Sequence, residues 1–214
     1  MRTLSDILTD VNSVMDLEAS APTGDELSTR TNYANQAVWD AAATGQLSEF
    51  KAEYLVNTST LATIAMPSNY RELMVNPQVL DSTGEWNEWD VIEAEAKYDY
   101  ASTDRYCYQL GNPNEGYSLV FNALFSMSTL SVVYQRYPSG LATLTDTCEL
   151  SDPQVVTRKV ESYVLYSRGD DRFPIAEQRS EKQLANMMGR EMKSSTGQSR
   201  DTKMKFRHPL KDLS

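Results

Sequence analysis

Residues 129–153 read TLSVVYQRYPSGLATLTDTCELSDP, and this stretch changes character at its middle. Its first half, Thr129 to Tyr137, is rich in β-branched and aromatic residues, which is typical of a β-strand. From Pro138 onward the stretch is a polar loop that ends at Asp152 and Pro153, where Asp favours a helix N-cap and Pro fits the first helical turn. This order predicts a β-layer inserted between the helices of one bundle.

Helical periodicity frames the chain on both sides of this stretch. Apolar residues spaced three and four apart predict helices over residues 3–15 and 25–43, a short helix over 48–55, and two more over 153–167 and 174–193. The alanines of the second helix allow a partner helix to approach closely. Because a lone helix pair buries its apolar faces poorly, we expect the helices from the two ends of the chain to pack together.

The middle of the chain favours strands instead. Strand composition is found over residues 60–67, 105–111, 117–122 and 129–137, and the NPNEG sequence between two of these segments is typical of a hairpin turn. We therefore predict an α+β fold, in which a helical bundle carries an inserted antiparallel β-domain and an extended C-terminal tail. The expected parts are N-terminal helices at 1–57, the β-domain at 58–150, C-terminal helices at 151–193 and the basic tail at 194–214.

The net charge of −10 is unevenly distributed. Residues 194–214 carry five basic and two acidic side chains, so the tail is +3 and residues 1–193 are −13. An acidic body does not attract nucleic acid through its average field, which disfavours tight non-specific DNA binding. A basic tail on an acidic body favours contact with another acidic protein surface, such as a neighbouring copy, and a solvated tail is the alternative.

Other features bound the cellular context. The sequence has no run of eighteen apolar residues, so we expect no membrane partner. Its opening, MRTLSDILTD, lacks the apolar core of a signal peptide, so we expect a cytosolic product. Cys107 and Cys148 form no CxxC pair, and two buried thiols in a reducing compartment are favoured over a disulfide.

Enzyme signatures are scarce in this sequence. The single histidine, His208, lies in the tail, and no phosphate-binding, dinucleotide-binding or metalloprotease motif occurs. Acidic residues are dense in GEWNEWDVIEAEA at 84–96, where two carboxylates could act in a hydrolase, but such density is typical of a solvated face. We expect no enzymatic activity and no catalytic, cofactor-binding or metal-binding residue.

Aromatic residues offer candidate contact surfaces. Trp86 and Trp89 could form a protein-contact or sugar-stacking platform, or Trp89 could anchor the sheet in the core, which we favour. Tyr98 and Tyr100 belong to a series of evenly spaced tyrosines. We therefore assign Trp86, Trp89, Tyr98 and Tyr100 as candidates for a tail-side or subunit interface.

Several of these segments resemble a known family. VVYQRYP at 132–138, LTDTCEL at 144–150 and the helix pair that closes with Ala185 to Met188 are similar to the second half of head-to-tail adaptor (connector, or head-completion) proteins of tailed bacteriophages. The opening TLSDILTDVNSVMD and the segment GDELSTRTNYANQAVWDAA resemble the first two helices of that family. The resemblance covers most of residues 1–193.

The resemblance implies a structural virion protein of the phage neck, assembled in the host cytoplasm. Such adaptors form a homo-oligomeric ring, typically a dodecamer, between the portal and the tail or stopper protein, and DNA only passes through the lumen. Their C-terminal segments commonly reach the portal, so the portal-contact candidates here are Lys203, Lys205, Phe206 and Arg207. The alternatives are a stopper or tail-terminator ring protein, a carbohydrate-binding β-module that uses Trp86 and Trp89, and a carboxylate hydrolase.

Overall fold

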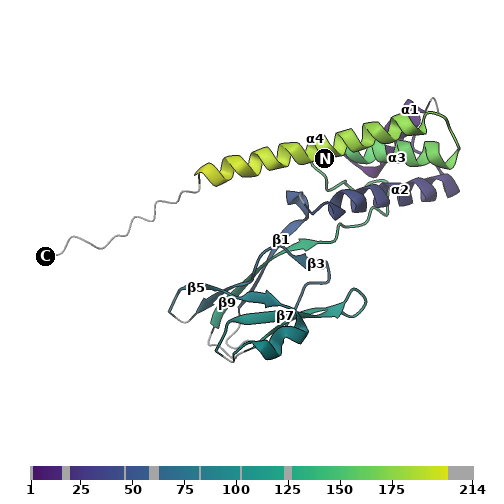
Figure 1. The fold of residues 1–214 in the computed structure, drawn as a ribbon. Helices are drawn as coiled ribbons and strands as arrows, with labels where there is room; N and C mark the ends of the chain where they lie inside the picture. The colour runs from purple at the N-terminus through teal and green to yellow at the C-terminus, as the bar shows by residue number, and fades with distance from the viewer. Residues whose placement is uncertain are drawn as a thin grey trace. The chain divides into compact units, whose positions relative to one another are not determined.

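The helices from the two ends of the chain form one unit, and the strands form another. The computed structural model describes residues 2–15, 20–45, 47–57, 63–81, 83–101, 103–122 and 127–201, with side chains left out at 127–128 and 191–201. Its contacts divide the chain into a helical unit, Met1–Ser48 with Gly140–Ser214, and a β unit, Glu49–Ser139 (Figure 1). The predicted α+β class, with a bundle built from both ends and an inserted β region, is confirmed.

The third helix, α3, is the centre of the helical unit. It packs against the other three helices, and most of its residues are buried or half-buried. A capping box at Thr3 and Asp6 fixes the start of the first helix. The helices are α1 (Leu4–Val14), α2 (Gly24–Ala43), α3 (Gln154–Ser167) and α4 (Phe173–Asp201). Their buried apolar side chains include Leu4, Ile7, Leu8, Val11, Ala34, Ala37, Val38, Ala41, Val155, Val156, Val160, Val164, Leu165, Ala176 and Met187.

Helix α4 extends beyond the N-terminal end of α3. Gln183 and Arg190 of α4 both reach Asp152, which stands at the start of α3. At about 1.5 Å per residue, the 29 residues of α4 span about 43 Å, roughly twice the length of α3. The expected end near Lys193 was wrong, because no proline interrupts the helix before Asp201 and Gly197 is tolerated within it.

The β unit contains two sheets that share one core. One sheet has the order β1-β9-β4-β5, with β3 also paired to β9, and the other has the order β2-β8-β7-β6. The pairs are antiparallel except β6 with β7, which is parallel. The strands are β1 (Lys51–Asn57), β2 (Thr63–Ala65), β3 (Tyr70–Leu73), β4 (Gln78–Asp81), β5 (Trp86–Glu88), β6 (Asp90–Ile92), β7 (Tyr106–Asn112), β8 (Gly116–Phe121) and β9 (Met127–Arg136). The shared core contains Met66, Tyr70, Val79, Trp89, Cys107, Leu119, Phe121, Leu130, Val132 and Tyr134.

The helix expected over residues 48–55 is wrong. Ser48–Phe50 form a single 3-10 turn, and Lys51–Asn57 then pair with β9 at seven consecutive positions. Half-buried Ala52, Tyr54 and Val56 alternate with exposed neighbours, so the segment follows the period of a strand. Pairing with β9 therefore overrides the helical tendency of Lys, Ala and Glu in this segment.

The NPNEG segment forms the expected turn, between β7 and β8. Asn112 Oδ1 accepts hydrogen bonds from the amides of Asn114 and Glu115. Gly111 has a φ of 106°, and a Cβ there would lie 2.0 Å from the Gly116 carbonyl oxygen, so the close approach of the strands requires glycine.

Both cysteines are free and buried, as expected. None of the helices in the described part of the chain has the length and apolar character that a membrane span needs.

Candidate interaction surfaces

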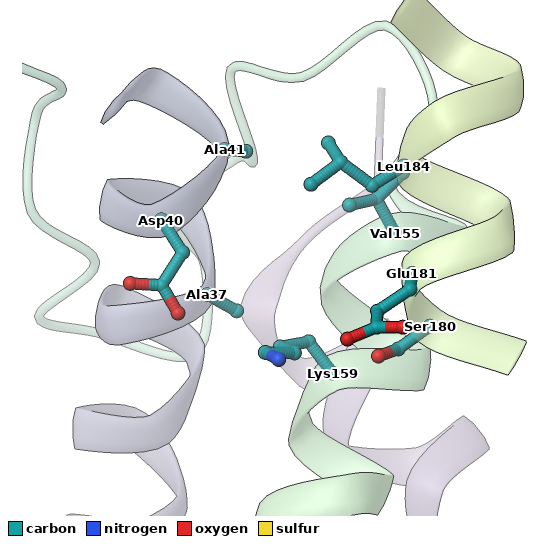
Figure 2. A pocket seen from close by; sticks show the side chains of 8 residues that line it. All are labelled: Ala37, Asp40, Ala41, Val155, Lys159, Ser180, Glu181 and Leu184. Carbon is teal, nitrogen blue, oxygen red and sulfur yellow. The ribbon is translucent and has the colours of Figure 1, made fainter. Parts of the chain in front are cut away.

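A hollow of about 70 Å³ opens between α2 and α4, with α3 as its floor. The hollow exists because α2 has small side chains here. Ala37 and Ala41 point toward α3, and larger residues at these positions would fill the space. Figure 2 shows Lys159 of α3 between Asp40 of α2 and Glu181 of α4. The lining residues are Ala37, Asp40, Ala41, Val155, Lys159, Ser180, Glu181 and Leu184.

Hydrogen bonds hold the charged side chains at this hollow. The Tyr163 hydroxyl donates to the Asp40 carboxylate, and burial together with that bond raises the pKa of Tyr163. Lys159 Nζ lies 2.7 Å from Glu177 Oε1, and the Ser162 hydroxyl donates to the other oxygen of the same carboxylate. Burial raises the pKa of Glu177, but the bonds from Lys159 and Ser162 outweigh it and lower the pKa overall.

The hollow is therefore negatively charged. Asp40, Glu177 and Glu181 place three carboxylates around the single ammonium group of Lys159. Glu181 is exposed, and no lysine or arginine among the described residues forms an ion pair with it. Such a site favours a basic side chain of a partner over an acidic one.

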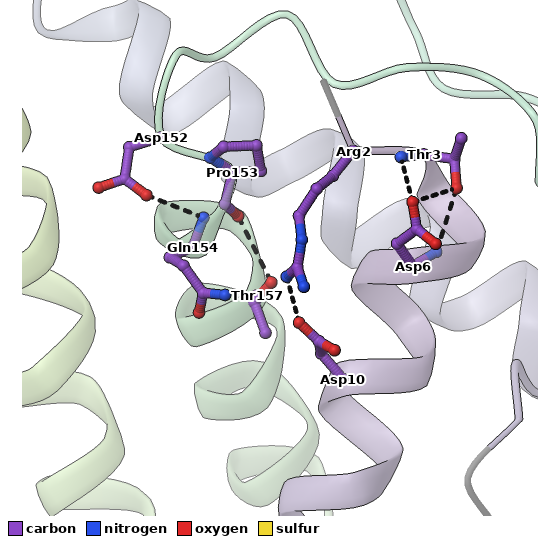
Figure 3. A network of polar contacts seen from close by, with 8 residues as sticks. All are labelled: Arg2, Thr3, Asp6, Asp10, Asp152, Pro153, Gln154 and Thr157. Atoms are coloured by element: carbon purple, nitrogen blue, oxygen red, sulfur yellow. Dashed lines mark hydrogen bonds and ion pairs between the residues drawn. The ribbon is translucent and has the colours of Figure 1, made fainter.

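Figure 3 shows two further sets of polar contacts, one within the N-terminal residues and one at the start of α3. Arg2 pairs with Asp10 of α1, and Thr3 exchanges hydrogen bonds with Asp6. Asp152 Oδ1 accepts the Gln154 amide at 3.2 Å, so the carboxylate expected to cap α3 does meet its first amide. The residue at the N-cap position is Pro153, however, one place later than expected.

The loop after β9 forms hydrogen bonds with both α2 and the N-terminal residues of the helical unit. The Asn35 side chain accepts a hydrogen bond from the Leu141 amide at 2.7 Å and donates one to the Leu141 carbonyl at 2.9 Å. The amide of Leu4 donates to the Asp146 carbonyl at 2.8 Å, and the amide of Cys148 donates to the Arg2 carbonyl at 2.9 Å. The polar loop thus ties α2 and the N-terminus to the chain that leads into α3.

Asp146 also organises the loop itself. Its carboxylate accepts the amides of Thr143 and Ala142 and the hydroxyl of Thr143, which lowers its pKa. This aspartate is the last residue of the Leu-Thr-Asp sequence at 144–146. Its role in the described structure is to close a turn.

The two tryptophans that were considered as a pair have different environments. Trp89 is 1% exposed and packs edge-to-face on Phe121, with ring centroids 5.1 Å apart. It lies between β5 and β6, where the chain passes from one sheet to the other. Trp86 is 51% exposed and pairs with Leu80, on the side of its sheet opposite the buried Val79. Trp89 is therefore a core residue, as favoured, and only Trp86 offers a surface.

Tyr98 and Tyr100 lie with the other sheet of the β unit. Tyr98 is 83% exposed, at the end of a 3-10 helix (Ala94–Asp99) that contacts β7. Lys97 Nζ lies 5.0 Å from the centre of the Tyr98 ring, and the Tyr100 and Tyr106 rings pack at a tilt of 48° with their centroids 5.1 Å apart. These tyrosines thus lie beside the sheet that contains β7, whereas Trp86 belongs to the other sheet, and the described residues do not bring them into one site.

The remaining candidates are outside the described residues. Lys203, Lys205, Phe206 and Arg207 all follow Asp201, where the description ends. Within the described residues, no group of three or more His, Cys, Asp or Glu side chains could hold a metal ion. The hollow and the two hydrogen bonds from Asn35 to Leu141 were not predicted from the sequence. The alanines of α2 were the one available signal for the hollow.

No protein-family model matches this chain, and no curated protein matches it.

Proposed function

We propose that this protein is a neck adaptor of a tailed bacteriophage, a structural protein that forms a ring between the portal and the tail or next neck protein. One observation carries the proposal: helices from both ends of the chain form one bundle, and the β unit is a single insertion between Ser48 and Gly140. That is the architecture which the resemblance of residues 1–193 to adaptor proteins implies. The predicted strand, loop and helix of residues 129–153 connect the two units.

The helical unit supports this role because its last helix is long. Helix α4 carries the chain past the end of α3 and delivers the basic segment that contains Lys203, Lys205, Phe206 and Arg207. A basic segment with an aromatic residue suits an acidic protein surface, and contacts made on docking offset the entropy lost in ordering it. We assign this segment to the portal contact.

The charge of the chain fits a DNA conduit. Residues 1–193 carry −13, so a ring of such bodies repels phosphate and lets DNA pass without binding. The β unit then supplies the surface for the tail side, with Trp86 as its most exposed tryptophan. In this proposal the protein is located in the virion neck after assembly in the host cytoplasm.

The other readings have less support. A stopper or tail-terminator protein is mainly a small β-barrel or α/β unit, whereas this chain has four α-helices among its described residues. A carbohydrate-binding platform of two tryptophans loses one member, because Trp89 is buried. No specific observation favours a hydrolase.

Mixing with the portal protein encoded in the same genome tests the proposal. Sedimentation of the full-length chain with and without that portal should give a complex with one copy of this chain per portal subunit. A chain that sediments at the same mass with and without the portal would reject the adaptor role.

A further inference from the structure

The exposed side of α4 carries a strip that complements the hollow between α2 and α4. Ile175, Arg179 and Lys182 recur at spacings of four and three, so they share one face of the helix. All three are exposed, and Ile175 is 56% exposed. Gln178, Glu181 and Ala185 lie beside Arg179 and Lys182 on the surface. The two cations make the strip basic, with Ile175 as an apolar side chain at its N-terminal end and Glu181 of the hollow at its border.

The strip and the hollow cannot meet within one molecule. Both include α4, and the helix turns its buried side, with Ala176, Ser180 and Met187, toward the bundle. Leu184 and Glu181 follow on one flank and line the hollow, whereas Lys182 and Ile175 lie on the far side. A contact between them requires two copies of the chain.

We propose that the strip on α4 of one copy docks onto the hollow of the next copy, and that this contact builds the ring. The Lys182 side chain enters the hollow beside the carboxylates of Asp40 and Glu181, and Arg179 lies at its rim. A space of about 70 Å³ admits the end of one side chain, not a whole helix. Ile175 then covers apolar surface of the neighbour.

This arrangement has the right symmetry for a ring. The two surfaces differ, so each copy offers a strip to one neighbour and a hollow to the other. Head-to-tail contacts of this kind close into rings when the rotation between copies permits. The inference rests on the ring proposed above and names the residues that would form it.

Charge reversal in the full-length chain tests the contact. Glu181→Lys makes the hollow repel the neighbour's Lys182, and Lys182→Glu makes the strip repel the neighbour's carboxylates. Each single variant should raise the concentration needed for self-association by about tenfold or more at low ionic strength. The double variant, which exchanges the two charges, should return close to the wild-type value.

Controls separate the contact from changes in net charge or folding. Glu95→Lys makes the same change at an exposed position of the β unit and should assemble like the wild type. Far-ultraviolet circular dichroism checks that each variant retains its helices. Sedimentation is recorded for each protein alone and with the portal protein.

The outcomes are distinct. The inference is overturned if both single variants assemble like the wild type, if the double variant is as impaired as the single ones, or if the wild type associates neither alone nor on the portal. Rings that form on the portal and ignore both substitutions would reject this contact and leave the adaptor role standing. Failure of the wild type to bind the portal would reject that role instead.

Discussion

Replacing Asn35 by alanine should destabilise the helical unit by about 2–4 kcal/mol. The substitution removes two hydrogen bonds to the backbone of Leu141, at 2.7 and 2.9 Å, each with a net value of about 0.5–1.5 kcal/mol. Leu141 is 5% exposed, so without the Asn35 side chain its amide and carbonyl groups are left partly without a hydrogen-bond partner. Leaving such a buried group unsatisfied costs up to about 1–3 kcal/mol, and part of that cost adds to the loss. The better helix propensity of alanine returns about 0.5 kcal/mol.

The matched control is Asn32→Ala. Asn32 is an exposed asparagine on the same helix, so it gains the same helix propensity and loses no contact to the loop. Urea unfolding followed at 222 nm reports on the helices, and the midpoint shift at constant slope gives the change in stability. If Asn35→Ala and Asn32→Ala unfold at the same urea concentration, the hydrogen bonds from Asn35 do not hold the loop and the prediction is wrong.

Three further predictions concern other parts of the fold. Trp89→Ala should cost about 3–5 kcal/mol in a urea titration because Trp89 is buried, whereas Trp86→Ala should stay within about 0.5 kcal/mol; similar losses for both would contradict the assignment of Trp89 to the core. A thiol reagent should label neither Cys107 nor Cys148 until urea unfolds the chain, since both are buried and burial raises the pKa of Cys107 to about 12; rapid labelling of the native protein would contradict this. Hydrogen bonds from Thr143 and Ala142 lower the pKa of Asp146, so the stability that this carboxylate contributes is present above about pH 4 and is lost as the pH falls below that. Asp146→Asn should therefore flatten the dependence of unfolding free energy on pH in this range, and an unchanged slope would contradict the role of Asp146.

Local sequence patterns predicted the elements whose own residues determine them. The three-and-four spacing of Leu4, Ile7, Leu8 and Val11 gave α1, because one apolar stripe is enough to define a helix that packs on a neighbour. Alternation in Leu130, Val132 and Tyr134 gave β9 in the same way. The turn between β7 and β8 was predictable because Asn, Pro and Gly act through their own backbone geometry.

Features that depend on distant residues were not predictable. Strand β1 looked helical because its residue types favour a helix, and only the partner strand, more than seventy positions later, decides the matter. The hollow assembles residues between Ala37 and Leu184 from three helices, so no local spacing marks it. Asn35 and Leu141 lie 106 positions apart, and an asparagine inside a helix carries no sign of such a partner.

The loop at 138–152 combines features that local sequence predicts with contacts between distant residues. Its composition predicted a connection and a new helix, which the structure contains. Its purpose became visible only in the contacts of Asn35, Asp146 and the N-terminal residues, which hold both ends of the chain in one bundle.

Electron cryomicroscopy of the neck isolated from virions would show directly whether this chain is an adaptor. We expect a ring of this chain directly below the portal, with the end of α4 toward the portal and continuous density for residues 202–214 against it. A neck without this chain, or a portal-bound ring in which those last residues have no density, would contradict the proposed role and its portal contact respectively.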